Sequence, residues 1–282
     1  MEKIELREVE LRSEELQDVM GKIPPWILRR GITALFAVDR VITLSQYKKS
    51  LLCNEYHIDP GKISVIPNGL ADTKLLLKNS IAELRTKWFL SVHESMILFA
   101  GRLHPVKGLS YLIGAFRKVL KTMPECRLII AGSGHYDNYI REAKDICTKV
   151  TFTGLLEKKE LYELYQLADV GVIPSLYEPF GYVAVEMMMY GLPIVATATS
   201  GLNEVVDDSC GLKIPVISHP DRVETDVNLL AEKILFLLQN PSKARKTGQN
   251  GRKRYLKEYS LEIFRRNMLA FYKSLITDFT NP

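Results

Sequence analysis

From about residue 38 onward, short runs of β-branched and other apolar residues alternate with stretches in which apolar residues recur at helical spacing. The continuous runs predict strands at residues 40–44, 64–66, 97–100, 127–131, 150–153, 170–173 and 193–196. The spaced stretches predict helices near 46–56, 81–90, 107–122, 137–147, 158–167 and 180–190. Continuous apolar strands that alternate with helices are typical of a parallel sheet covered on both faces. We therefore expect an α/β protein with a doubly wound parallel sheet.

The remainder, from about residue 225 to 276, has a helical pattern without strands between. Its apolar residues recur at helical spacing in two groups, and core packing is the expected role of both. The groups are Leu229, Leu230, Ile234 and Leu237, and then Phe264, Met268, Phe271 and Tyr272.

The composition is that of a soluble globular protein with a sizeable core, since 46% of the residues are hydrophobic and 25% are charged. The first residues are too charged for a signal peptide, and no apolar run is long enough to cross a bilayer. The four cysteines form no CxxC pair, which argues against a disulfide or zinc framework. We expect a cytoplasmic protein.

The formal charge of +5 is unevenly placed, because residues 243–266 are rich in Lys and Arg and contain only Glu258 and Glu262 as acids. A basic stripe can attract anionic lipid headgroups or nucleic acid. The solvated face of a surface helix is the more common explanation, and the stripe lacks the interleaved aromatic residues that stack on bases. We expect no nucleic-acid partner, and peripheral membrane contact is not indicated.

Parallel sheets of this kind bind ligands at the carboxyl ends of their strands. Four loops at such ends carry glycines or charges that suit a phosphate ligand. The glycine turns are equally explained as tight turns, and the two cations of the first loop as solvated surface charges. The residues concerned are Gly101, Arg102 and Lys107, then Gly132 and Gly134, then Gly154, and finally Glu178.

Glu186 lies in an otherwise apolar stretch that begins near Pro179, a residue suited to the first helical position. A buried carboxylate without a partner costs several kcal/mol, so Glu186 needs one. Either it faces an internal Lys or Arg, or its oxygens accept hydroxyls of a sugar ring while the helix start binds an anion.

Together these motifs resemble the donor half of a GT-B glycosyltransferase of the large retaining group known as family 4. Further matching pieces lie at residues 41–45, 65–69, 191–196 and 199–206, and the resemblance runs over roughly residues 38–275. It implies a Rossmann-like doubly wound sheet, the C-terminal half of a GT-B fold, with a helical C-terminal tail.

The resemblance also implies roles for individual residues. Arg102, Lys107 and Glu178 would be catalytic: the two cations would grip the donor diphosphate and stabilise the leaving group, while Glu178 would contact the transferred sugar. Glu186 would bind the ribose hydroxyls. Donor-binding positions would also include Gly101, Gly132, Gly134, Gly154, Phe180, Gly181, Tyr182 and Val183.

Two features of the resemblance concern what the chain lacks. No Asp-x-Asp metal motif is present, which is consistent with the family's ability to replace a divalent cation by Arg, Lys and a helix dipole, so the resemblance implies neither a metal nor another cofactor. The substrate that the resemblance implies is a nucleotide-diphosphate sugar, with UDP or GDP as the nucleotide. Tyr182 stands where the family usually has a small aliphatic residue.

The family's acceptor-binding domain normally precedes the strand at 41–45 by well over a hundred residues, and here that part is short. We expect residues 1–37 to be a helical remnant or linker, residues 38–240 the donor-binding domain, and residues 241–282 helices that pack back on it. A separate acceptor-domain chain or self-association would then complete the cleft. His57, His93, His104, His135 and His219 match no acceptor-side histidine and are expected to be non-catalytic.

The expected activity is retaining, metal-independent transfer of a hexose-like sugar from a nucleotide diphosphate to a glycan, lipid or small molecule. The alternative is a nucleotide-sugar binding subunit or scaffold without turnover. A third class, a sugar epimerase of similar architecture, would need an acid/base set built from two domains, and the sequence offers one side only.

Overall fold

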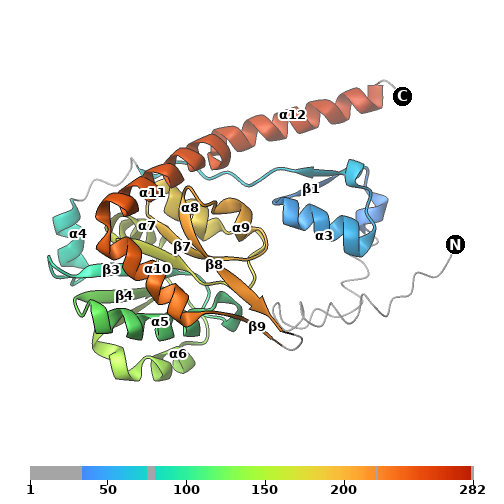
Figure 1. Ribbon diagram of the computed structural model, residues 1–282. Coiled ribbons are helices and arrows are strands. Elements are labelled where there is room, and N and C mark those ends of the chain that lie inside the picture. Colours follow the sequence, from blue (N-terminus) through green and yellow to red (C-terminus); the bar gives the residue numbers. More distant parts are fainter. Residues whose placement is uncertain (1–33, 75–79, 220–221, 281–282) are drawn as a thin grey trace. The chain divides into compact units, whose positions relative to one another are not determined.

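The computed structural model describes residues 34–74, 80–219 and 222–280, with side chains through Ile276 (Figure 1). The described residues form two compact units, one ending at Ile66 and the other beginning at Pro67. This boundary differs from the expected domain start near residue 38. The reason lies in strand pairing, because the first two predicted strands pair with each other and not with the large sheet.

The first unit contains two short parallel strands, β1 (Val41–Thr43) and β2 (Ile63–Val65), with the helix α3 (Gln46–Tyr56) between them. Ser45 caps this helix by accepting a hydrogen bond from the Lys48 N–H at 3.3 Å. A 3-10 turn, η1 (Pro60–Lys62), leads into β2. The predicted strands and the helix at 46–56 are confirmed.

The second unit is built on a seven-stranded sheet in the order β5-β4-β3-β6-β7-β8-β9. All neighbouring pairs are parallel except β8 and β9, which are antiparallel. The strands are β3 (Ser95–Ala100), β4 (Cys126–Ala131), β5 (Val150–Gly154), β6 (Val170–Ile173), β7 (Ile194–Ala198), β8 (Gly211–Ser218) and β9 (Val223–Thr225).

The strand order contains a switch point between β3 and β6. The chain runs outward from β3 to β5, then returns to β6 on the other side of β3 and continues outward to β8. The helices that follow β3 and β6 therefore lie on opposite faces of the sheet, and the loops that lead into them start at its carboxyl edge, where sheets of this topology bind ligands. The expected doubly wound α/β fold is confirmed.

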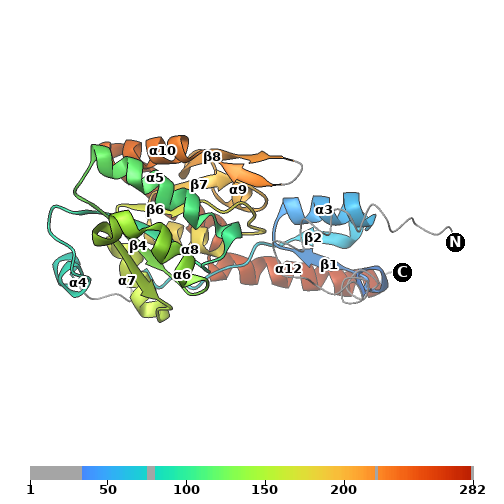
Figure 2. The same cartoon turned by 90° about the horizontal axis from the view of Figure 1, so that it is seen from below.

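Helices cover both faces of the sheet (Figures 1 and 2). On one face, α5 and α10 pack against each other and share a core with Ile97 and Phe99 of β3. On the other face, Gly171 of β6 lies against Met187 of α8, and α7 and α11 pack on that helix. Because both faces are covered, the central strands are apolar along their length rather than alternating.

The helices of the second unit follow the strands closely in sequence. They are α4 (Ile81–Lys87), α5 (Leu109–Thr122), α6 (Tyr136–Glu142), α7 (Lys158–Leu167), α8 (Tyr182–Tyr190), α9 (Leu202–Val205), α10 (Val227–Gln239), α11 (Pro241–Arg254) and α12 (Leu261–Thr280), with 3-10 turns η3 (Pro105–Lys107) and η4 (Lys144–Lys149) and a π turn η5 (Tyr255–Tyr259). The expected helical C-terminal tail is present. Within the described ranges, no helix is both long and apolar enough to cross a membrane.

Three sequence predictions need correction. The strands β8 and β9 were not predicted, because Lys213 and Pro215 interrupt the apolar run of β8, a strand near the sheet edge. The predicted helix at 137–147 is α6 followed by a 3-10 turn, broken where Ile146 leaves helical geometry at φ −121°. The helix predicted from residue 180 begins at Tyr182, for a reason given below.

Candidate functional site

The loops that leave β3 and β6 are fastened to each other at the switch point. The Leu176 N–H donates to the Val106 carbonyl oxygen at 2.8 Å, which joins the two loops through their backbones. Gly108, with φ +68°, lies so close to Pro174 that a Cβ atom there would stand 1.9 Å from the Pro174 carbonyl oxygen. Only glycine fits this position.

An ion pair joins the same two loops. Lys107 Nζ lies 2.5 Å from Glu178 Oε2, and the two side chains are 26% and 16% exposed. Arg102 lies in the same loop and is exposed, and its side chain makes no hydrogen bond or ion pair with any described residue. The structure thus brings Lys107 and Glu178 into contact and leaves a second cation accessible in the loop that carries Lys107.

The glycines after β4 and at the end of β5 lie against neighbouring loops. The Leu103 N–H donates to Ser133 O at 2.8 Å, and the Gly132 N–H donates to Gly154 O at 2.9 Å. A Cβ atom on Gly132 would stand 1.8 Å from the carbonyl oxygen of Gly101. Tight packing between loops is therefore enough to explain the glycine at 132.

The same holds for Gly134, where a Cβ atom would stand 2.3 Å from the Leu103 carbonyl oxygen. At the carboxyl edge, the loop after β3 is consequently packed against the loops after β4 and β6.

The helix α8 begins at Tyr182, three residues after Pro179, which the sequence suggested as the first helical residue. Gly181 adopts φ 100°, a left-handed conformation that ends the preceding loop and cannot belong to a right-handed helix. The N–H groups of Tyr182 and Val183 therefore have no intrahelical acceptor, and no side chain caps this end. They carry the positive end of the helix dipole.

Phe180 and Gly181 thus belong to the loop and not to the helix. The Phe180 ring is 3% exposed and packs edge-on against Tyr182 and Tyr259, with ring centroids 5.1 and 6.1 Å away. The hydroxyl of Tyr182 accepts a hydrogen bond from Asn68 Nδ2. The start of α8 is thus held by ring packing with Phe180 and by a hydrogen bond from Asn68.

Glu186, in the second turn of α8, has a tyrosine as its partner rather than the internal Lys or Arg that the sequence suggested. Tyr165 of α7 donates its hydroxyl to Glu186 Oε2 at 2.8 Å. Among the described residues, the carboxylate makes no ion pair and its second oxygen has no hydrogen-bond partner. Burial raises the pKa of Glu186, and the Tyr165 hydrogen bond opposes that shift.

The loop after β3 also places a histidine beside these charges. His104 Nδ1 accepts a hydrogen bond from the Val106 N–H at 3.3 Å, so the ring's other nitrogen carries the proton in the neutral form. Burial, followed by the charges of His135, Arg102 and Lys107, lowers the pKa of His104. His104 is therefore neutral at physiological pH and caps η3 structurally.

Comparison with known proteins agrees with this geometry. Residues 80–254 match the family described as glycosyl transferases group 1. The chain belongs to that family. The matched range contains every site residue discussed above, from Gly101 to Glu186.

Similar proteins extend the match over the second unit and beyond it. An uncharacterised glycosyltransferase of Methanocaldococcus jannaschii is 39% identical over 176 residues, which cover 59% of this chain and 44% of the relative. The solved sucrose-phosphate synthase of Thermosynechococcus elongatus is 29% identical, with a TM-score of 0.72, and the match covers 88% of this chain and 61% of that one.

A third similar protein shares the fold. It is the Anabaena protein HepE, solved in complex with UDP and glucose, which is 22% identical with a TM-score of 0.71; the match covers 86% of this chain and 67% of that one. The architecture is thus that of GT-B glycosyltransferases. This chain spans about half the length of the curated relatives it matches, 44% and 53% for two of them.

Two features of this candidate site were not predicted from the sequence. One is Tyr165, which appeared only as part of an amphipathic helical stretch, although its three-residue spacing from Tyr162 places both on one helix face. The other is a pair of buried threonines, Thr197 within β7 and Thr199 directly after it. Thr199 donates to the Leu176 carbonyl at 2.8 Å and Thr197 to that of Ser175, which fixes the loop after β6.

Proposed function

We propose that this chain binds a nucleotide-diphosphate sugar at the carboxyl edge of its sheet and forms the donor side of a retaining sugar transfer. The observation that carries the proposal is the junction at the switch point. There Lys107 and Glu178 pair across two loops that share a backbone hydrogen bond, and Glu178 stands four residues before the uncapped start of α8.

The diphosphate is assigned to Arg102, Lys107 and the first amides of α8. Charge-assisted hydrogen bonds from two cations and from a helix N-terminus suit a diphosphate, and the same groups stabilise the negative charge that develops on the leaving nucleotide. In the free protein the Lys107 ammonium group donates a hydrogen bond to the Glu178 carboxylate. A bound diphosphate would take over part of that contact and leave Glu178 for the hydroxyls of the sugar. We propose that this requires no divalent metal.

The ribose is assigned to Glu186. Its Oε2 atom is held by Tyr165, while the other oxygen has no protein partner among the described residues and remains for a hydroxyl donor. A ligand that contains both a diphosphate and a cis-diol would contact the cations and the start of α8 through its diphosphate, and Glu186 through its diol. Two structurally similar proteins support the choice of ligand class, since HepE was solved with UDP and glucose and TarM of S. aureus with UDP.

The proposal is tested by calorimetric titration of UDP, GDP and ADP into the purified chain in the presence of a chelator. We expect one of the three to bind under these conditions. Absence of binding for all three, with binding restored by Mg²⁺, would refute the metal-free arrangement of Arg102 and Lys107. Absence of binding with and without Mg²⁺ would refute the site altogether.

A second candidate function is nucleotide-sugar binding without turnover, because the contacts described here, the Lys107–Glu178 pair, the uncapped start of α8 and Glu186, are all contacts to a donor. Proximity between donor and acceptor contributes a large part of the rate of a group transfer, and donor contacts alone do not supply it. Release of free nucleotide from UDP-glucose or GDP-mannose, with and without added sugar acceptors, separates the two functions. Binding without acceptor-dependent release supports the second.

A further inference from the structure

Three tyrosines cluster between α7 and α8 beside Glu186. The ring centroids of Tyr162, Tyr165 and Tyr190 lie 5.5–6.2 Å apart in every pair. Tyr165 is 2% exposed and Tyr190 is 6% exposed. Rings at these separations hold one another in place, so the direction of each hydroxyl is set by packing.

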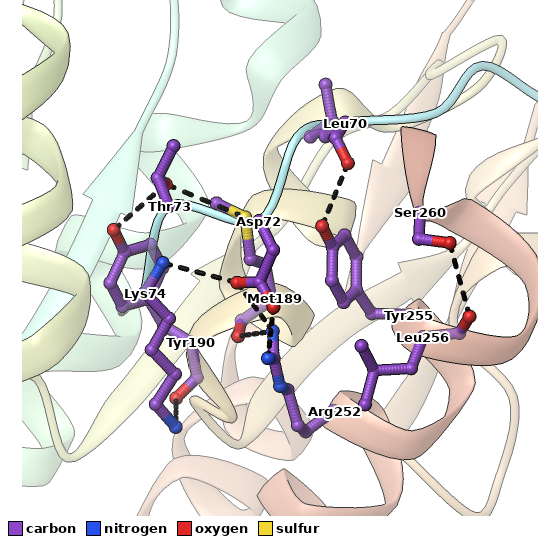
Figure 3. A network of polar contacts seen from close by, with 10 residues as sticks. All are labelled: Leu70, Asp72, Thr73, Lys74, Met189, Tyr190, Arg252, Tyr255, Leu256 and Ser260. Atoms are coloured by element: carbon purple, nitrogen blue, oxygen red, sulfur yellow. Dashed lines mark hydrogen bonds and ion pairs between the residues drawn. The ribbon is translucent and has the colours of Figure 1, made fainter. Parts of the chain in front are cut away.

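The hydroxyls of Tyr165 and Tyr190 have different partners. Tyr190 shares a hydrogen bond with Thr73 Oγ1 at 3.1 Å, and Figure 3 shows this contact beside the C-terminal end of α8. Tyr165 instead donates to Glu186 Oε2 at 2.8 Å. Only one of these two neighbouring tyrosines therefore acts on the carboxylate by a hydrogen bond, and the other offers a matched control.

The contact between Tyr165 and Glu186 has a chemical consequence. A carboxylate rotates about its last side-chain bond unless one of its oxygens is held. A donor fixed on Oε2 stops this rotation and presents the remaining oxygen in one direction. It also supplies a hydrogen bond to the ionised form, which an isolated buried carboxylate would lack.

We infer that Tyr165 is the positioning residue for ribose recognition: it holds Glu186 so that the free carboxylate oxygen accepts the 2′- and 3′-hydroxyls of the nucleotide. This inference rests on the proposed function, because it takes Glu186 to be the ribose contact. Tyr165 itself touches no ligand and acts through Glu186 alone. Its removal therefore weakens the recognition of the cis-diol and leaves the diphosphate contacts of Arg102 and Lys107 unchanged.

A purely structural role for Tyr165 would look different. A buried tyrosine that only stabilises the packing of α7 on α8 would, on losing its hydroxyl, lower the free energy of unfolding and weaken every ligand to the same extent. The two roles are thus separated by a ligand that lacks the diol.

The experiment compares UDP with 2′,3′-dideoxy-UDP by calorimetry, or the guanosine pair where UDP does not bind. The proteins are the wild type, Tyr165→Phe, Tyr190→Phe, Glu186→Ala and the double variant Tyr165→Phe/Glu186→Ala. We expect Tyr165→Phe to bind the ribonucleotide about tenfold more weakly and the dideoxy nucleotide as the wild type does. Tyr190→Phe should match the wild type with both ligands.

The double variant tests whether Tyr165 acts through Glu186. It should lose no more affinity than Glu186→Ala alone, because the hydroxyl has then no carboxylate to hold. If Tyr165→Phe loses the same affinity for both nucleotides, or loses affinity for neither, the inference about Tyr165 is overturned. The ribose contact of Glu186 still stands in that case, provided that the wild type binds the ribonucleotide more tightly than the dideoxy nucleotide. A wild type that binds both nucleotides equally would overturn the ribose contact itself, and the inference with it.

If Tyr165→Phe does not fold, 3-fluorotyrosine at position 165 keeps the ring and the hydroxyl but alters the strength of the hydrogen bond. The ratio of the two nucleotide affinities should then change with the substitution at 165 and stay constant with the same substitution at 190. A constant ratio at both positions would also overturn the inference.

Discussion

At the scale of single residues, the central feature is the Lys107–Glu178 pair. Both side chains are mostly buried, so neither charge could remain there without a partner at low cost. A bound diphosphate would compete with the Glu178 carboxylate for the Lys107 ammonium group. The pair is therefore a stable resting arrangement that an anionic ligand can rearrange.

Substitution of Lys107 or of Glu178 distinguishes the role of one residue from that of the other. Lys107→Met should weaken nucleoside diphosphate binding by roughly 1.5–3 kcal/mol, because a charge-assisted hydrogen bond is lost. Glu178→Gln should leave nucleoside diphosphate binding unchanged or tighter, since Lys107 is released, while a nucleotide sugar should lose any advantage over the nucleotide. Calorimetry with UDP or GDP and the matching sugar nucleotide measures both. Lys118→Met, an exposed position on α5, serves as the control.

Gly108→Ala should destabilise the second unit by roughly 2–4 kcal/mol, because the new methyl group meets the Pro174 carbonyl oxygen and φ is +68°. Gly114→Ala in α5 is the matched control. There the new Cβ atom meets only the Val227 side chain, at 3.2 Å, and the change should be within about 1 kcal/mol in either direction. Urea unfolding compares the two. Equal stability of both variants would show that the loops after β3 and β6 separate at little cost.

At the scale of elements, the segment at residues 70–74 fastens α8 to the C-terminal helices (Figure 3). The Leu70 N–H donates to Tyr259 O at 2.9 Å, and its carbonyl accepts from the Tyr255 hydroxyl at 2.8 Å. Arg252 forks onto both oxygens of Asp72 and also donates to Met189 O at 2.8 Å. This network holds the C-terminal end of the helix that carries Glu186.

The Asp72–Arg252 pair should make the free energy of unfolding depend on pH in the acidic range. The Arg252 hydrogen bond lowers the pKa of Asp72 below its ordinary value of 3.8. The folded state thus favours the ionised form, so the pair's contribution is present above about pH 4 and is lost as the pH falls through the lowered pKa. Asp72→Asn should cost about 1–2 kcal/mol at pH 7 and progressively less in acid.

Unfolding in denaturant from pH 7 to pH 3 measures this difference. Asp145→Asn is the matched control, because Arg117 forks onto Asp145 in the same way but at the surface. Its cost should be smaller than that of Asp72→Asn. A difference between wild type and Asp72→Asn that grows as the pH falls would contradict the assignment.

At the scale of the whole molecule, the candidate site lies within the second unit, since all its residues follow Pro67. A ligand at a hundredfold excess over its Kd stabilises the unit that binds it by about 2.7 kcal/mol. We therefore expect hydrogen exchange to slow in the loops after β3 and β6 and at the start of α8 when the nucleotide is added. Exchange in α3, which belongs to the first unit, should stay the same. Protection of α3 without protection of the loop from Gly101 to Gly108 would place the ligand elsewhere.

Much of the fold could be predicted from the sequence because its determinants are local. Continuous apolar runs are typical of buried parallel strands, and the spacing of apolar residues is typical of helices. The strand at Val170–Ile173 and the helices at Gln46–Tyr56 and Lys158–Leu167 agree with the predicted bounds to the residue. Elements at the sheet edge were missed because their apolar pattern is interrupted, as in β8 by Lys213 and Pro215.

Most residue types of the candidate site, the loops that carry them and the glycosyltransferase family could be predicted from the sequence, because motifs and periodicity are properties of neighbouring residues. The sequence could not determine which side chains meet. That Lys107 pairs with Glu178, that Tyr165 rather than Lys or Arg holds Glu186, and that Gly181 delays the start of α8 were decided only by tertiary structure. The physical reason is that these contacts join residues far apart in the chain or depend on a backbone conformation set by packing, and neither leaves a periodic trace in the sequence.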